Sequence, residues 1–284
     1  MNESDVSVMI LLAGAAALGV SIYKRWLSRR AFVDAPTRRT PLESVDIAAG
    51  FFVLICGMLL FSMVINRVAP ASSADGQKPG DVVLRSLLYQ LIVLAPVAVY
   101  AVMRCMRDGA WRELGVVPRS IRRELPMAAV GLMIAAPLVF GVITAVTLIG
   151  EPLGLQEPDD LSHTMLRALR DADSIVPVIG IFLSAAVLAP VLEEVIYRGL
   201  IQTALVNTLG ADHRWLVVLT AGILFGVIHV GQPPQQLVGL VVLGICLGWL
   251  YERSGSLWPS ILVHAGFNAI NLTMVLMGAG GSNS

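Results

Sequence analysis

The sequence predicts an all-α, polytopic membrane protein built as a helical bundle with about eight transmembrane helices. Its 284 residues are 56% hydrophobic and only 14% charged, and the mean hydropathy is +0.76. Soluble domains of ordinary composition carry about 25% charged residues. Long apolar runs recur along almost the whole chain. Because lipid offers the backbone no hydrogen-bond partners, such runs must form helices rather than open strands.

A helix needs about 20 residues to cross the hydrocarbon core of a bilayer. We expect eight such segments, at about 6–23, 47–65, 83–103, 126–149, 175–206, 215–230, 235–251 and 257–277. The fifth is longer than one crossing requires, and it contains charged residues. The first has Glu3 and Asp5 before it and no basic residue, which favours a retained anchor over a cleaved signal peptide.

The distribution of basic residues predicts how the chain sits in the cell membrane. The loops 24–46 and 104–124, together with Arg198, Arg214 and Arg253, hold 15 of the 20 Lys and Arg residues. Because basic loops remain in the cytoplasm, we expect both termini to lie outside. The acidic loop 150–174, with a short surface helix around 161–169, would then face outward.

The net charge argues against a nucleic-acid-binding protein, and the cysteine spacing argues against disulfides and cysteine metal sites. The formal net charge is zero, so no nucleic-acid partner is expected. The three cysteines, Cys56, Cys105 and Cys246, have no disulfide or metal-ligand spacing and are expected to be apolar fillers.

We expect residues 1–125 to form N-terminal transmembrane helices with the basic loops, and 126–284 to form a catalytic core.

Three apolar segments contain ionisable or amide side chains, which cost at least a few kcal/mol each at membrane depth and so usually have a function. In the fragment Leu-Glu-Glu-Val-Ile-Tyr-Arg, Glu194 and Arg198 are four residues apart and can pair on one helix face. Glu193 points about 100° away from Glu194 and lacks such a partner, which suits a general base or acid. The alternative is that both glutamates belong to an ion-pair network that only holds helices together.

The other two fragments supply imidazoles and an amide. His229 follows Phe225 by four residues near the end of its helix, and His264 shares a helix face with Asn268. An imidazole and an amide directed at one point can bind a developing oxyanion. The alternative is that these residues make hydrogen bonds between packed helices, as polar residues commonly do in membranes.

Helix lengths allow the depths of these residues to be compared. Counted from the expected cytoplasmic helix ends, Glu193 lies about 21 Å deep and His229 about 22 Å deep. His264 lies only about 10 Å deep by the same count. Convergence of all three therefore requires a tilt, a kink or a funnel around His264.

The three fragments together resemble the motif set of the CAAX-protease and bacteriocin-processing family (CPBP or Abi) of intramembrane proteases, which is related to type II CAAX prenyl endopeptidases. The family pattern is Glu-Glu-x-x-x-Arg, then Phe-x-x-x-His, then His-x-x-x-Asn or Asp. The matching positions are Glu193, Glu194, Arg198, Phe225, His229, His264 and Asn268. Order and spacing agree in full, and the resemblance covers roughly residues 175–277.

The resemblance implies an endopeptidase (a hydrolase) with a cavity that opens toward the cytoplasm. Glu193 and His229 would activate a water molecule, His264 and Asn268 would stabilise the oxyanion, and Glu194, Arg198 and Phe225 would support the site. Substrates would be hydrophobic, membrane-associated or CAAX-like, lipidated peptides. The oligomeric state is not predicted.

Metal use and catalysis itself have alternatives. The family is commonly described as metalloproteases, and Glu193, His229 and His264 are candidate ligands for Zn²⁺. The sequence lacks the His-Glu-x-x-His spacing that supplies two zinc ligands from one helix. Water activation without a metal therefore stays equally open. The competing functions are a proton-coupled transporter, since buried Glu, Arg and His form proton relays, and a non-catalytic membrane scaffold.

Overall fold

The computed structural model describes residues 3–68, 78–107, 109–153 and 164–281. Within these ranges the chain forms helices and turns and no strand. Seven helices are long and apolar enough to cross a membrane. The chain is thus a multi-pass membrane protein with an all-helical fold, as its composition predicts.

The helices follow the expected segments closely. Their bounds are α1 Glu3–Tyr23, α2 Ser44–Val68, α3 Pro79–Tyr89, α4 Ala95–Met106, α5 Ile121–Gly150, α6 Thr164–Arg170, α7 Ile175–Phe182, α8 Ala189–Glu194, α9 Thr203–Leu209, α10 Arg214–Val227, α11 Pro234–Ser254 and α12 Leu257–Gly281. The expected surface helix in the acidic loop corresponds to α6, although residues 154–163 lie outside the described ranges.

Two of the spanning units contain π-helical turns. The unit α3–α4 is joined by η3 (Gln90–Leu94), and the unit α7–α9 contains η6 (Leu183–Leu188) and η7 (Val195–Gln202). π-helical turns are rare and occur frequently at functional sites. Here two of them flank α8, the six-residue helix that ends with Glu193 and Glu194.

The sixth expected crossing, 215–230, is a shorter helix. α10 has 14 residues, which is about 21 Å of helix and less than a full span. It packs tightly against α11 through glycines, because a Cβ at Gly222 would lie 2.6 Å from the Ile245 side chain and 2.8 Å from its backbone nitrogen. The two helices therefore run in close contact and are joined by a short turn, residues 228–233.

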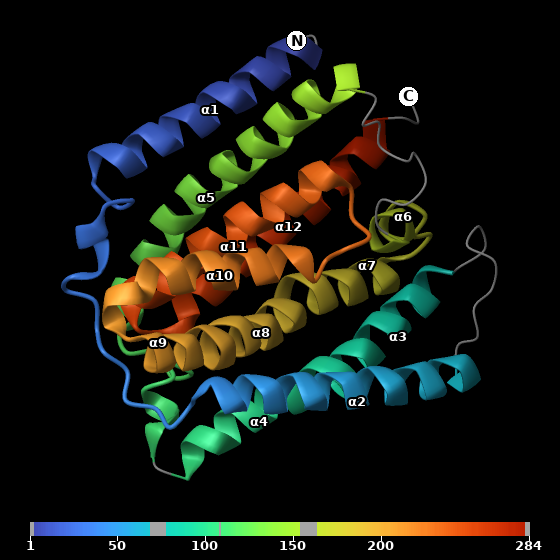
Figure 1. Ribbon diagram of the computed structural model, residues 1–284. Coiled ribbons are helices and arrows are strands. Elements are labelled where there is room, and N and C mark those ends of the chain that lie inside the picture. The colour runs from blue at the N-terminus through green and yellow to red at the C-terminus, as the bar shows by residue number, and fades with distance from the viewer. Residues whose placement is uncertain (1–2, 69–77, 108, 154–163, 282–284) are drawn as a thin grey trace.

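The helices are arranged in layers around the unit α7–α9 (Figure 1). α1 and α5 lie side by side on one face, α10, α11 and α12 lie in the middle, and α2, α3 and α4 cover the other face. The start of α1 and the end of α12 lie at the same end of the bundle. The main apolar core lies where α4, α5, η7, α11 and α12 meet.

A buried polar cluster joins the segment before α2 to η7, α10 and α11. Glu252 on α11 is fully buried, and its carboxylate pairs with both Arg38 and Arg214. Gln202 donates a further hydrogen bond of 2.9 Å to the same carboxylate. We refer to these four residues as the Glu252 cluster. It fixes the loop between α1 and α2 against η7, α10 and α11.

Candidate active site

The predicted pair of Glu194 and Arg198 is confirmed. Both side chains are fully buried, and Arg198 donates to Glu194 Oε1 over 2.8 Å. The second guanidinium nitrogen donates to the backbone carbonyl of Gly244 on α11, over 3.0 Å. Arg198 also lies over the Phe225 ring, 4.9 Å from its centroid. Arg198 thus joins η7 to both α10 and α11.

His264 lies between Glu193 and Glu194. The sequence did not indicate that His264 contacts either glutamate. Its Nδ1 is 2.9 Å from Glu194 Oε1, and its Nε2 is 3.8 Å from Glu193 Oε2. The imidazole is nearly buried, whereas the Glu193 side chain is 17% exposed. When Nδ1–H donates to Glu194, Nε2 is directed toward the side on which Glu193 lies. Glu194 is therefore both the partner of Arg198 and the group that orients His264.

Phe225 holds the two imidazoles apart. Its ring contacts His229 at 5.1 Å and meets His264 edge-on at 5.4 Å between centroids. We expected His229 to lie near the end of its helix, and this is wrong. α10 ends at Val227, and His229 lies in the turn that follows. Its Nδ1 is 2.7 Å from the Phe225 carbonyl, so Nδ1–H donates to the backbone, and Nε2 has no hydrogen-bond partner among the described residues. A short turn, residues 228–233, then leads into α11.

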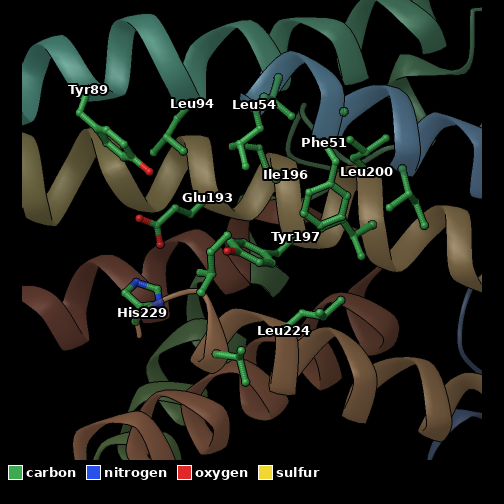
Figure 2. Close-up of a pocket in the computed structure, with 16 residues that line it drawn as sticks. Phe51, Leu54, Tyr89, Leu94, Glu193, Ile196, Tyr197, Leu200, Leu224 and His229 are labelled. Carbon is green, nitrogen blue, oxygen red and sulfur yellow. The ribbon is translucent and has the colours of Figure 1, made fainter. Parts of the chain in front are cut away.

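Glu193 and His229 line the same cavity, which has a volume of about 360 Å³. Figure 2 shows the Glu193 carboxylate and the His229 imidazole facing each other at one end, with the Tyr89 hydroxyl directed toward Glu193. The remaining walls are mostly apolar. They are formed by Ile47, Gly50, Phe51, Leu54, Leu94, Val97, Ile196, Tyr197, Leu200, Ile201, Leu224, Val227 and Ile228.

Asn268 has a different neighbour from the one predicted. Its side-chain N–H donates to the carbonyl of Ala185 in η6, over 2.8 Å. Within the described part of the chain, no hydrogen bond joins it to Glu193, His229 or His264. It lies one helical turn beyond His264 on α12, and its amide nitrogen has a second N–H besides the one that donates to Ala185.

The depth mismatch for His264 does not prevent its approach to Glu193. The count placed Glu193 deep because it assumed α-helical rise from Glu193 to the end of its helix. Eight of the intervening residues form η7. A π-helix has more residues in each turn and advances less per residue, which reduces the true difference in depth between the two side chains.

The candidate metal ligands do not form a metal site in this arrangement. Among the described residues, no group of three or more His, Cys, Asp or Glu side chains is close enough to hold an ion. In both imidazoles Nδ1 is the engaged nitrogen, bonded to Glu194 in His264 and to the Phe225 carbonyl in His229, so Nε2 is the nitrogen that would face an ion. A three-ligand centre would require Glu193, His229 and His264 to lie closer together than they do here.

The sequence reasoning missed the three Phe and Tyr residues that line the cavity. Tyr89 comes from α3, Phe51 from α2, and Tyr197 lies one turn after Glu193. Tyr89 and Phe51 belong to apolar helices with no motif, so no sequence signal distinguishes them from lipid-facing residues. Tyr197 stands inside the first motif, and its position four residues after Glu193 could have identified it.

Comparisons with known proteins agree with the motif reading. Residues 175–270 match the family described as "Type II CAAX prenyl endopeptidase Rce1-like". A curated relative, the UPF0177 protein YaiF of Lactococcus lactis subsp. lactis (strain IL1403), is 36% identical over 91 residues. That match covers 32% of this chain and 38% of the relative. No solved structure gives a significant match.

The family match covers the segment that holds all three motifs. It confirms the resemblance predicted from Glu193, Glu194, Arg198, His229 and His264. In broad terms it supports a CAAX-type intramembrane protease.

Proposed function

We propose that this chain is an intramembrane endopeptidase that hydrolyses peptide bonds in apolar, membrane-associated or CAAX-like substrates. The observation that carries the proposal is the shared cavity, in which a carboxylate and an imidazole face each other next to an apolar space. The family match over 175–270 supports the same reaction class. Membrane-associated and lipidated peptides are the partners that such a cavity suits.

Glu193 and His229 would activate the attacking water. Nε2 of His229 accepts a hydrogen bond from the water and orients it, while the Glu193 carboxylate accepts the proton. The hydroxide then adds to the peptide carbonyl carbon. Glu193 returns the proton to the amide nitrogen as the carbon–nitrogen bond breaks. Such positioned proton transfer contributes about 100-fold to 10,000-fold to rate.

His264 would stabilise the oxyanion of the tetrahedral intermediate. Because its Nδ1 is engaged by Glu194, it can donate from Nε2 only when the ring carries both protons. Arg198 holds Glu194 in place, and Glu194 in turn fixes the orientation of the His264 ring. Asn268 would complete the oxyanion site by donating its second amide N–H to the substrate.

The deciding experiment removes the proposed base without changing its shape. We expect Glu193→Gln to insert and purify like the parent protein but to lose cleavage of apolar peptides by about 100-fold or more. Cleavage would be followed by mass spectrometry of the products in detergent or proteoliposomes. Glu113→Gln, which changes a side chain that is 45% exposed, is the matched control and should keep full activity. A Glu193→Gln protein that cleaves at the parental rate would end the proposal.

A further inference from the structure

The cavity that contains Glu193 and His229 has two chemically distinct ends. Tyr89, Glu193 and His229 lie at one end, and Phe51 and Leu200 lie at the other (Figure 2). The second end is formed by Gly50, Phe51 and Leu54 of α2 together with Leu200 and Ile201 of η7. We refer to these five residues as the apolar pocket.

A glycine allows α2 to form one wall of this pocket. A Cβ at Gly50 would lie 2.6 Å from Cδ2 of Leu200, so only glycine permits α2 to lie this close to η7 without moving Leu200. The close approach places the next residue, Phe51, over the cavity. Successive helix residues point about 100° apart, and Phe52 accordingly does not line the cavity and is 68% exposed.

The residues that line the apolar pocket differ in how deeply their side chains are buried. Leu200 and Ile201 are buried in the main core at 1% and 5% exposure. Phe51 is 41% exposed and lies at the rim, so its size can change without disturbing the core. A substitution at Phe51 can therefore change the size of the pocket, whereas Leu200 and Ile201 are held by the core.

We propose that the apolar pocket receives one apolar side chain of the peptide substrate next to the scissile bond, and that Phe51 sets the largest side chain accepted. The inference rests on the proposed endopeptidase function. The occupant follows from continuity, because the pocket and the Glu193–His229 pair belong to one cavity. A peptide carbonyl held between Glu193 and His229 leaves the neighbouring side chain directed toward Phe51 and Leu200.

Three of the pocket residues, Gly50, Phe51 and Leu54, lie outside the segment that matches the protease family, which begins at residue 175. The reacting groups therefore come from the matched segment, and much of the selectivity wall comes from α2. Side-chain selectivity can then change in α2 without any change in the motifs.

Peptide-binding measurements test whether Phe51 limits the side chain that the apolar pocket accepts, and they do not require cleavage. In a full-length Glu193→Gln background, dissociation constants would be measured for short alanine peptides that carry a single Leu or a single Trp. One methylene in an apolar pocket changes discrimination by about 10-fold or more. We expect Phe51→Ala to raise the preference for the Trp peptide over the Leu peptide by about 10-fold, and Phe51→Trp to lower it.

The neighbouring residue supplies the matched control. Phe52→Ala removes the same ring from the next position of the same helix and should leave the Trp-to-Leu ratio unchanged. Phe51→Leu is the milder variant should Phe51→Ala fold poorly, and it should shift the ratio in the same direction. Equal ratios for the Phe51 and Phe52 variants, or no binding of either peptide, would overturn the pocket.

The two proposals fail in different ways. Cleavage by the parent protein together with unaltered selectivity of the Phe51 variants would remove only the pocket. Selective binding that follows Phe51, without cleavage by a chain that retains Glu193, would remove the protease and leave the pocket.

Discussion

Glu194 Oε1 accepts hydrogen bonds from two side chains at once, Arg198 and His264, although all three groups are buried within apolar helices. An isolated buried charge is costly unless it is paired and hydrogen-bonded. Here the guanidinium is further satisfied by the Gly244 carbonyl and the Phe225 ring. The arrangement therefore orients His264 while it compensates the Glu194 charge.

Removal of Arg198 should reveal this dependence. We expect Arg198→Leu to cost about 3–5 kcal/mol, because Glu194 would stay buried without its cationic partner. The measurement is the midpoint of thermal unfolding in detergent. Arg119→Leu is the control, since Arg119 and Glu113 form an exposed pair 3.6 Å apart and such pairs contribute at most about 1 kcal/mol. Equal midpoints for the two variants would show that the buried pair contributes little.

Among the contacts at the candidate site, the sequence predicted the local one and missed the distant ones. The four-residue spacing of Glu194 and Arg198 is a local property, and the pair forms as expected. His264 contacts Glu194 across 70 residues of chain, and no spacing rule reaches that far. The bond from Asn268 to Ala185 was missed for the same reason, because it depends on a carbonyl in the π-helical η6.

At the scale of elements, the crossing of α10 and α11 determines where the imidazoles lie. Gly222 and Gly244 bring the two backbones together, since a Cβ at Gly244 would lie 2.9 Å from the Gly222 Cα. Phe225 follows Gly222 by one turn and contacts both His229 and His264. Any separation of these two helices therefore displaces the groups of the site.

A single methyl group at this crossing should separate the helices. We expect Gly222→Ala to destabilise the protein by about 1–3 kcal/mol, because the added methyl meets the backbone nitrogen of Ile245, which cannot rotate away. Thermal unfolding and peptide cleavage should both decline. The control is Gly19→Ala on α1, where a Cβ meets nothing within 4 Å and alanine favours the helix. Parental stability of Gly222→Ala would mean that the helices are not in such close contact.

Helix positions were predictable from apolar runs, but irregularities within the helices were not. The run 175–206 correctly indicated one long unit, whereas its two π-helical segments leave no trace in hydropathy. The segment 215–230 suggested a full crossing, but the helix ends at Val227.

At the scale of the whole molecule, the basic loops gather at one end. In Figure 1 the loops after α1 and α4 lie at the end opposite to the start of α1 and the end of α12. This grouping agrees with the loops that hold most of the Lys and Arg residues. The positive-inside tendency then predicts that this end faces the cytoplasm.

Accessibility to a membrane-impermeant maleimide tests the orientation. In a background in which Cys56, Cys105 and Cys246 are replaced, we expect Lys78→Cys to be labelled in intact cells and Arg112→Cys only after permeabilisation. Both positions are exposed in the structure, so a difference in labelling reports the side of the membrane. The reverse pattern would place the basic loops and the proposed cavity opening outside.

The Glu252 cluster bears on how the protein is assembled during synthesis. Arg38 precedes its carboxylate partner by 214 residues, which corresponds to about 10 to 40 seconds of translation. Until α11 has been made, neither Arg38 nor Arg214 can reach Glu252. The two guanidinium groups therefore lack this partner while the earlier helices insert, and the cluster can be completed only when the nascent chain is nearly finished.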